Sequence, residues 1–127
     1  MTNWSAIKYF RPEEFTCQCG CGAADMKLHF VQTLDLLRGY FGKPLIITSG
    51  YRCPTHNNAV SSTGFDGPHT TGLAADIAIS RHDAHALLVH AMKLRFTGIG
   101  VNQKGAGRFL HLDLIPEGPT RPWVWSY

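Results

Sequence analysis

A single aspartate inside an apolar run limits the folds open to this chain more than any other feature. Asp76 lies in residues 73–79, where every neighbour is alanine, leucine or isoleucine. Such a run is too apolar for a half-exposed strand, so it predicts a strand in the interior of a sheet. A carboxylate there is costly to bury unless it is paired or binds a metal. The alternative is an ordinary ion pair or helix cap at the strand end.

Two histidines in separate segments are candidate partners for this carboxylate. Seven residues of straight strand between His69 and Asp76 would span more than ~20 Å, so residues 70–72 must turn the chain back. His111 lies in a second strand-like run, and Asp113 follows on the same face, about 6–7 Å away. Two histidines and one carboxylate are the usual ligands of catalytic zinc. We therefore predict a Zn²⁺ site at His69, Asp76 and His111.

Apolar periodicity indicates the scaffold around these segments. Helical spacing predicts two long helices, over residues 25–40 with Asp25 as N-cap and Gly42 as terminator, and over residues 81–94 with Ser80 as cap. Shorter helical segments are expected at 11–15 and 56–61, and a loop at 61–68. Apolar and β-branched runs predict further strands at 45–48, 98–101, 107–115 and 123–127.

This order of elements predicts an α+β fold. We expect a single domain over residues 1–127, with a small, mostly antiparallel sheet and helices packed on one side. Residues 1–25 are expected to form an irregular N-terminal segment that packs on it.

Composition and charge exclude several classes of protein. The formal net charge of +3 suits an anionic surface such as a cell wall, but the basic residues are few and scattered. A nucleic-acid partner is therefore not expected. No apolar run approaches the roughly 20 residues that span a bilayer, and residues 1–8 lack the apolar core of a signal peptide. We expect a protein made in the cytoplasm, without stable membrane association.

Four cysteines allow more than one interpretation. Cys17, Cys19, Cys21 and Cys53 have a spacing tighter than that of common structural zinc sites. A cytoplasmic origin disfavours a disulfide framework. Free thiols in a glycine-rich turn, with one bridge formed after release, are the main interpretation. A second metal cluster of thiolates is the alternative.

Two residues that follow the predicted strand at 45–48 are candidates for substrate contact. Arg52 follows the turn at Ser49-Gly50-Tyr51 and could face a substrate carboxylate or a developing oxyanion. It could equally be a structural arginine that binds loop carbonyls. His56 could line the cleft. The remaining histidines are weaker candidates. His82, His85 and His90 are expected to be solvated on a helix, and His29 lies at the edge of the apolar stripe of the first long helix.

Several short motifs occur together in one order between about residues 10 and 125. They are Ser49-Gly50-Tyr51-Arg52, His69 with Gly72 and Asp76, Gly98-Ile99-Gly100, Phe109-Leu110-His111-Leu112-Asp113, and Arg121-Pro122-Trp123. This set resembles the zinc D-Ala-D-Ala carboxypeptidase family, which includes peptidoglycan endopeptidases and phage endolysins and shares its fold with the hedgehog signalling domain. The small form looks most like phage or prophage L-alanyl-D-glutamate endopeptidases.

The resemblance implies a site and a substrate. His69, Asp76 and His111 would bind one catalytic zinc, with water in the fourth position. Arg52 would orient substrate or stabilise charge, and Ser49, Tyr51 and His56 would bind substrate beside it. The substrate would be the L-Ala–D-Glu bond of peptidoglycan stem peptides, cut during cell lysis or release. Such enzymes act as monomers on the wall after a holin opens the membrane.

One departure from the family pattern concerns the catalytic acid. Many members carry it two or three residues before the last zinc histidine, where this chain has Phe109 and Arg108. A branch with a His-x-Asp pair offers Asp113 instead, so we predict that Asp113 is the general base or orients the zinc water. Asp66 and Glu117, on flanking loops, are the alternative candidates for this role.

Two other functions stay open at this point. One is a DD-endopeptidase or DD-carboxypeptidase that acts on D-Ala bonds. The other is a non-catalytic, zinc-containing protein that binds the wall, as in hedgehog-like relatives.

Overall fold

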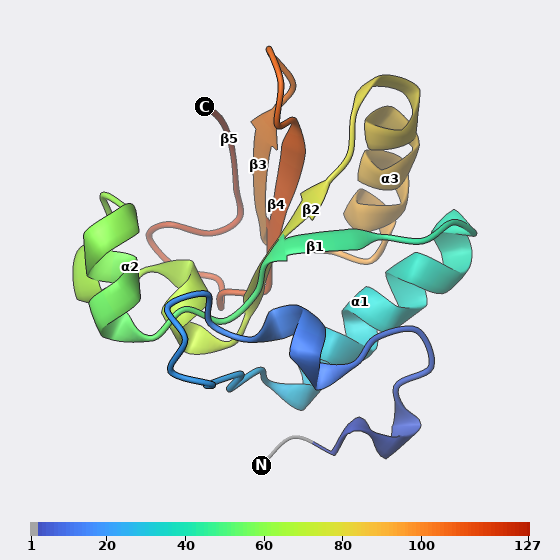
Figure 1. The fold of residues 1–127 in the computed structure, drawn as a ribbon. Coiled ribbons are helices and arrows are strands. Elements are labelled where there is room, and N and C mark those ends of the chain that lie inside the picture. Colours follow the sequence, from blue (N-terminus) through green and yellow to red (C-terminus); the bar gives the residue numbers. More distant parts are fainter. Residues whose placement is uncertain (1–2) are drawn as a thin grey trace.

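Five strands form one mixed sheet in the computed structural model, which describes residues 3–127 (Figure 1). The strands are β1 (Ile46–Ser49), β2 (Ala74–Ala78), β3 (Gly98–Asn102), β4 (Phe109–Asp113) and β5 (Trp123–Ser126). Their order across the sheet is β1-β2-β4-β3-β5. Three neighbouring pairs are antiparallel, and β3 with β5 is parallel. The predicted mostly antiparallel α+β fold is confirmed.

The two long helices lie on one side of this sheet and the short one on the other (Figure 1). The helices are α1 (Leu28–Phe41), α2 (Pro54–Val60) and α3 (Arg81–Lys93). Four 3-10 turns complete the elements: η1 (Trp4–Ala6), η2 (Pro12–Phe15), η3 (Gly64–Asp66) and η4 (Pro68–Thr71). Within residues 3–127, none of the helices has the length and apolarity that crossing a bilayer demands.

Alternation along the strands gives the sheet one apolar and one polar face. Ala75 and Ile77 of β2, like Leu110 and Leu112 of β4, belong to the buried core. The intervening residues must point the opposite way, because side chains alternate along a strand. The core is completed from the helices by Phe30, Val31, Leu34 and Leu37 of α1 and Ala84, Leu87 and Ala91 of α3. Each large apolar side chain buried there contributes about 1.5–3 kcal/mol. The opposite face is left for polar chemistry.

The start of α1 differs from the prediction. Asp25 is not the N-cap; that position belongs to Lys27, whose backbone is extended. The reason is a tertiary contact, since the amide of Lys27 donates to the carbonyl of Gly72 at 2.9 Å. This contact holds residues 25–27 extended against the turn after η4. The predicted end of α1 is confirmed, because Gly42 has a left-handed φ of 81°.

Apart from η1 and η2, the N-terminal segment is irregular, and it docks where β1 ends. Phe10 and Phe15 are buried, with ring centroids 5.7 Å apart. The carbonyl of Phe15 accepts from the amide of Tyr51 at 2.9 Å. A Cβ on Gly50 would lie 2.6 Å from Cα of Phe15, so glycine permits this close approach. Residues 1 and 2 of the predicted segment lie outside the described range.

Candidate metal centre and cleft

Sheet register brings the three predicted metal ligands together on the polar face. Asp76 of β2 and His111 of β4 are direct cross-strand partners. His69 lies in η4, and its ring centroid is 5.1 Å from that of His111. Gly72 makes the turn between His69 and Asp76 with a φ of 76°. A side chain at this glycine would also overlap the carbonyl of Asp25, so the turn requires glycine on two grounds.

The distances among the three donor atoms fit a zinc ion. Oδ1 of Asp76 lies 3.3 Å from Nε2 of His69 and 3.0 Å from Nδ1 of His111. In a tetrahedral site with bonds of about 2.0–2.1 Å, neighbouring donor atoms lie about 3.4 Å apart. All three groups can each offer one donor atom within 4.8 Å of the others. The set of two imidazoles and one carboxylate therefore suits zinc in both chemistry and spacing.

Outer partners fix which nitrogen of each histidine faces this centre. Nδ1 of His69 donates to the carbonyl of Gly50, 2.8 Å away, which leaves Nε2 free to bind metal. Nε2 of His111 lies 2.7 Å from Oδ2 of Asp113 and donates to it, so Nδ1 faces Asp76. His69 therefore presents Nε2 and His111 presents Nδ1 to the same point beside Asp76.

Asp113 lies behind His111 and is saturated with protein partners. Arg121 binds it through two hydrogen bonds, from Nε to Oδ1 at 2.9 Å and from Nη2 to Oδ2 at 2.7 Å. Oδ1 also accepts from the amide of Ile115 at 3.3 Å. The Asp113 side chain is fully buried and Arg121 is 8% exposed. The contacts of Asp113 therefore orient a ligand.

Charges around the centre favour a bound cation. Burial would raise the pKa of Asp76, but hydrogen bonds from His111 and His69 outweigh it and hold the pKa below its usual range. Burial would also raise the pKa of Asp113, and hydrogen bonds from His111 and Arg121 lower it to about 2. Burial lowers the pKa of His111, but the carboxylates of Asp113 and Asp76 outweigh burial and raise it. Both carboxylates are therefore ionised at neutral pH.

Two glycines of β3 make room for this arrangement. Gly98 lies opposite Asp113, and a Cβ there would overlap the Asp113 carboxylate. Gly100 lies opposite both His111 and Trp125. A Cβ on Gly100 would lie 2.6 Å from Nε1 of Trp125. In the Gly98-Ile99-Gly100 motif, the isoleucine side chain packs in the core. The two glycines lack side chains on the opposite face, which leaves room there for Asp113 and Trp125.

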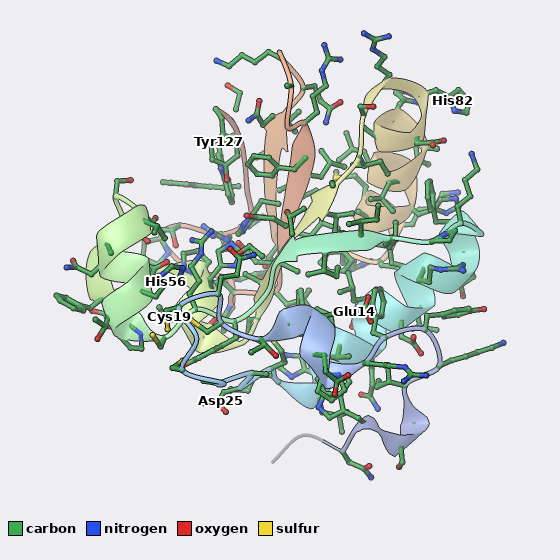
Figure 2. The ribbon with its side chains drawn as sticks, viewed as in Figure 1. Glu14, Cys19, Asp25, His56, His82 and Tyr127 are labelled. Atoms are coloured by element: carbon green, nitrogen blue, oxygen red, sulfur yellow. The ribbon has the colours of Figure 1, made fainter. Side chains whose placement is uncertain are left out.

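A cleft of about 620 Å³ opens onto His69 and His111. One part of its wall is aromatic and comes from the C-terminal strand and the residue after it. The other part comes from the turn that precedes η4. The lining residues include Ser61, Ser62, Thr63, Asp66, Gly67, Thr120, Arg121, Trp123, Trp125 and Tyr127. Tyr127 projects beside β5 in Figure 2.

Arg52 lies next to the metal centre. Its Nη2 is 3.7 Å from Oδ2 of Asp76, and its amide donates to the carbonyl of His69 at 3.1 Å. Nη1 donates to Oδ1 of the fully buried Asn57, whose amide group in turn binds Thr63 and Gly64. Arg52 is thus tied both to the metal ligands and to the cleft turn.

The other predicted substrate and base residues are spread more widely. Ser49 pairs with Asp76 across β1 and β2, and Tyr51 packs against the core. His56 is half-buried on α2 (Figure 2). These three lie outside the residues that line the cleft, as do Arg52 and Glu117. Asp66 is exposed and lines it.

The sequence analysis assigned no role to three residues at this site. Arg121 was named only as part of a motif. Its guanidinium group donates to Asp113, and Cζ of that group lies 5.1 Å from the ring centroid of Trp125. Trp125 in turn packs beside His111, at 5.0 Å between ring centroids. Tyr127 lines the cleft. Aromatic residues at 123, 125 and 127 alternate as on one strand face, which was the available signal.

A comparison with protein families completes the description of the site. The model of the family described as Peptidase M15 matches residues 8–113, which include His69, Asp76, His111 and Asp113. No match was found among curated proteins. Peptidases of this family depend on zinc, so the predicted zinc cofactor is confirmed, and His69, Asp76 and His111 form its candidate site. The chain belongs to the Peptidase M15 family and is a zinc metallopeptidase.

Proposed function

We propose that this zinc peptidase hydrolyses the L-Ala–D-Glu bond in the stem peptides of peptidoglycan, in the course of cell lysis or release. The observation that carries the proposal is the convergence of His69, Asp76 and His111 beside an aromatic-walled cleft. The net charge of +3 suits an anionic wall polymer. The choice of bond rests on the ordered motifs that resemble L-alanyl-D-glutamate endopeptidases.

Three atoms would hold the metal: Nε2 of His69, Oδ1 of Asp76 and Nδ1 of His111. Zinc, when bound, polarises the scissile carbonyl and lowers the pKa of a coordinated water to about 7. The outer contacts from Gly50 to His69 and from Asp113 to His111 keep both rings in the productive orientation.

The proton acceptor is one of two carboxylates, and their surroundings differ. Asp113 was predicted as the base or as an orienting partner, and its buried, saturated carboxylate favours the second role. Asp66 is exposed and shares the cleft with His69 and His111. We therefore propose Asp66 as the group that takes the proton from water and passes it to the leaving amine.

Two further groups are proposed to meet negative charge on the substrate. Arg52 keeps its cation 3.7 Å from Asp76 and is proposed to face a substrate carboxylate or the developing oxyanion. Burial raises the pKa of Tyr127, so its phenol stays protonated at neutral pH. Because Tyr127 lines the cleft, it is proposed as a second hydrogen-bond donor there.

Mapping the cleaved bond tests this assignment. Purified peptidoglycan would be digested with zinc-loaded protein, and mass spectrometry would identify the new amino-terminal residue of each product. We expect D-Glu. A new amino terminus at D-Ala, or a newly freed side-chain amine of diaminopimelate at the cross-link, would instead identify an enzyme that cuts D-Ala bonds. Absence of any product, with zinc at the centre, would favour a wall-binding protein. His111→Ala, checked for folding by circular dichroism, is the matched control.

The route to the wall is also a proposal. We infer synthesis in the cytoplasm and action on the wall after holin-type release, as a monomer. This inference is supported by the resemblance to endolysins. Co-expression with and without a holin, followed by measurement of lysis, tests it.

A further inference from the structure

Four thiols from two distant segments meet at the surface beside the metal centre. Cys17, Cys19 and Cys21 come from the N-terminal segment and Cys53 from the turn that precedes α2. Their sulfur atoms all lie within 4.8 Å of one another. Cys17 is buried, Cys53 is half-buried, and Cys19 and Cys21 are exposed.

The distances among these sulfur atoms fit a tetrahedral metal site. Sγ of Cys19 lies 3.5 Å from Sγ of Cys17 and 3.7 Å from Sγ of Cys53. A zinc ion with four bonds of about 2.3 Å to sulfur places neighbouring sulfur atoms about 3.8 Å apart. A disulfide would need about 2.05 Å. These two separations are thus close to the edge of a ZnS₄ tetrahedron, and the other sulfur pairs lie within 4.8 Å.

The backbone is shaped to direct these side chains inward. Gly20 and Gly22 follow Cys19 and Cys21 and have φ values of 89° and 79°, a region that other residues rarely adopt. The left-handed conformation of these two glycines turns the chain, so that Cys17, Cys19 and Cys21 can point to a common centre. The amide of Cys17 donates to the carbonyl of Ala23 at 2.7 Å, which closes the loop. The amide of Cys53 donates to Sγ of Cys17 at 3.3 Å, a contact that favours a thiolate there.

We propose that Cys17, Cys19, Cys21 and Cys53 bind a second, structural zinc ion. The full set of four protein sulfurs leaves no position for substrate, which is the property that separates structural from catalytic zinc. Soft thiolates also select zinc over magnesium or calcium. This site is separate from the His69, Asp76 and His111 centre and does not depend on which peptide bond the enzyme cuts.

The second ion would join the N-terminal segment to the residues that orient the catalytic centre. Cys53 directly follows Arg52, whose amide binds the carbonyl of His69. Two residues before Arg52, Gly50 accepts the hydrogen bond from Nδ1 of His69. In the N-terminal segment, two residues before Cys17, the carbonyl of Phe15 accepts a hydrogen bond from the amide of Tyr51. A metal at the four cysteines would therefore fix the loop that holds His69 and Arg52, in a segment with little regular structure of its own.

Counting bound metal in the purified protein tests the proposal. Protein prepared under reducing conditions with zinc would be dialysed. Its zinc content would then be measured by inductively coupled plasma mass spectrometry. We expect two zinc ions per chain in the wild type. Cys19→Ser with Cys21→Ser, both at exposed positions, should retain one, and His111→Ala should also retain one. A His111→Ala protein that holds no zinc, or a double cysteine variant that holds as much zinc as the wild type, would overturn the proposal.

Cobalt spectroscopy gives a second readout, and its main measurement uses the wild-type protein. Cobalt would be loaded into wild-type protein that has been freed of zinc. Tetrahedral thiolate coordination should give intense red d–d bands and a charge-transfer band in the near ultraviolet. The His111→Ala protein should keep these bands. Their absence from the wild type, or an intact mass that reveals disulfides in reduced protein, would rule the site out.

Discussion

His111 has a carboxylate on each side, and the two carboxylates have opposite relations to the centre. Asp76 faces Nδ1 and can share a metal with it, whereas Asp113 holds Nε2 from behind. Both aspartates were predicted, because one lies in an apolar run and the other follows His111 on the same strand face. The partner of Asp113 was not predicted. Arg121 lies beyond a loop, and no local pattern links a residue after a strand to a carboxylate inside it.

Replacing each candidate base separately should distinguish the roles of Asp113 and Asp66. Asp113→Asn should lower zinc affinity or activity by about 10–100-fold, because it removes the charged acceptor for His111. Asp66→Asn should leave zinc content unchanged and lower kcat by about 10²–10⁴-fold. Zinc analysis and muropeptide kinetics on both variants provide the measurement. Full activity in Asp66→Asn, with a loss confined to kcat in Asp113→Asn, would transfer the base role to Asp113.

Arg121 should matter for stability as well as for orientation. Arg121→Met leaves the Asp113 carboxylate buried without its charged partner, which costs about 3–5 kcal/mol in the free energy of unfolding. Lys104→Met is the matched control, since Lys104 is exposed, and it should change stability by no more than about 0.5 kcal/mol. Urea titration, monitored by circular dichroism, measures the free energy of unfolding of both variants. Equal stability of the two variants would show that the buried pair is unimportant to the fold.

At the level of elements, the sequence predicted what alternation and periodicity encode. The long helices and the strands appear within a few residues of their predicted bounds, because apolar spacing marks the face that each element buries. The order β1-β2-β4-β3-β5 was not predictable. Periodicity tells which face a strand buries, and it does not identify the neighbouring strand. The N-cap of α1 was missed for a similar reason, since Gly72 holds Lys27 through a contact that local sequence does not show.

The glycines of β3 give a test at this scale. Gly98→Ala should destabilise the protein by about 1–3 kcal/mol and reduce activity, because the added Cβ overlaps the Asp113 carboxylate. Gly118→Ala is the control, since a Cβ there meets nothing within 4 Å. Thermal unfolding and wall hydrolysis of the two variants would be compared. A Gly98→Ala protein with wild-type stability and activity would show that β3 can shift away from Asp113 without consequence.

As a whole, the molecule separates stability from chemistry across one sheet. The two long helices cover the apolar face (Figure 1). The metal centre and the cleft occupy the other face. Ionised carboxylates can be kept on the second face because hydrogen bonds from histidine and arginine satisfy them. This separation explains why a short chain can both maintain a core and present a charged site.

The most direct test of the central claim is wall hydrolysis with the metal removed and restored. Zinc-loaded protein would be run in a gel that contains purified cell walls and then renatured with zinc, with a chelator, or with a chelator followed by excess zinc. His69→Ala, confirmed as folded, would run beside it. We expect clearing by the wild type with zinc, its loss in chelator, and its return when zinc is restored, and we expect no clearing from the variant. Clearing that persists in chelator or in His69→Ala, or a zinc-loaded wild type that clears nothing, would contradict it.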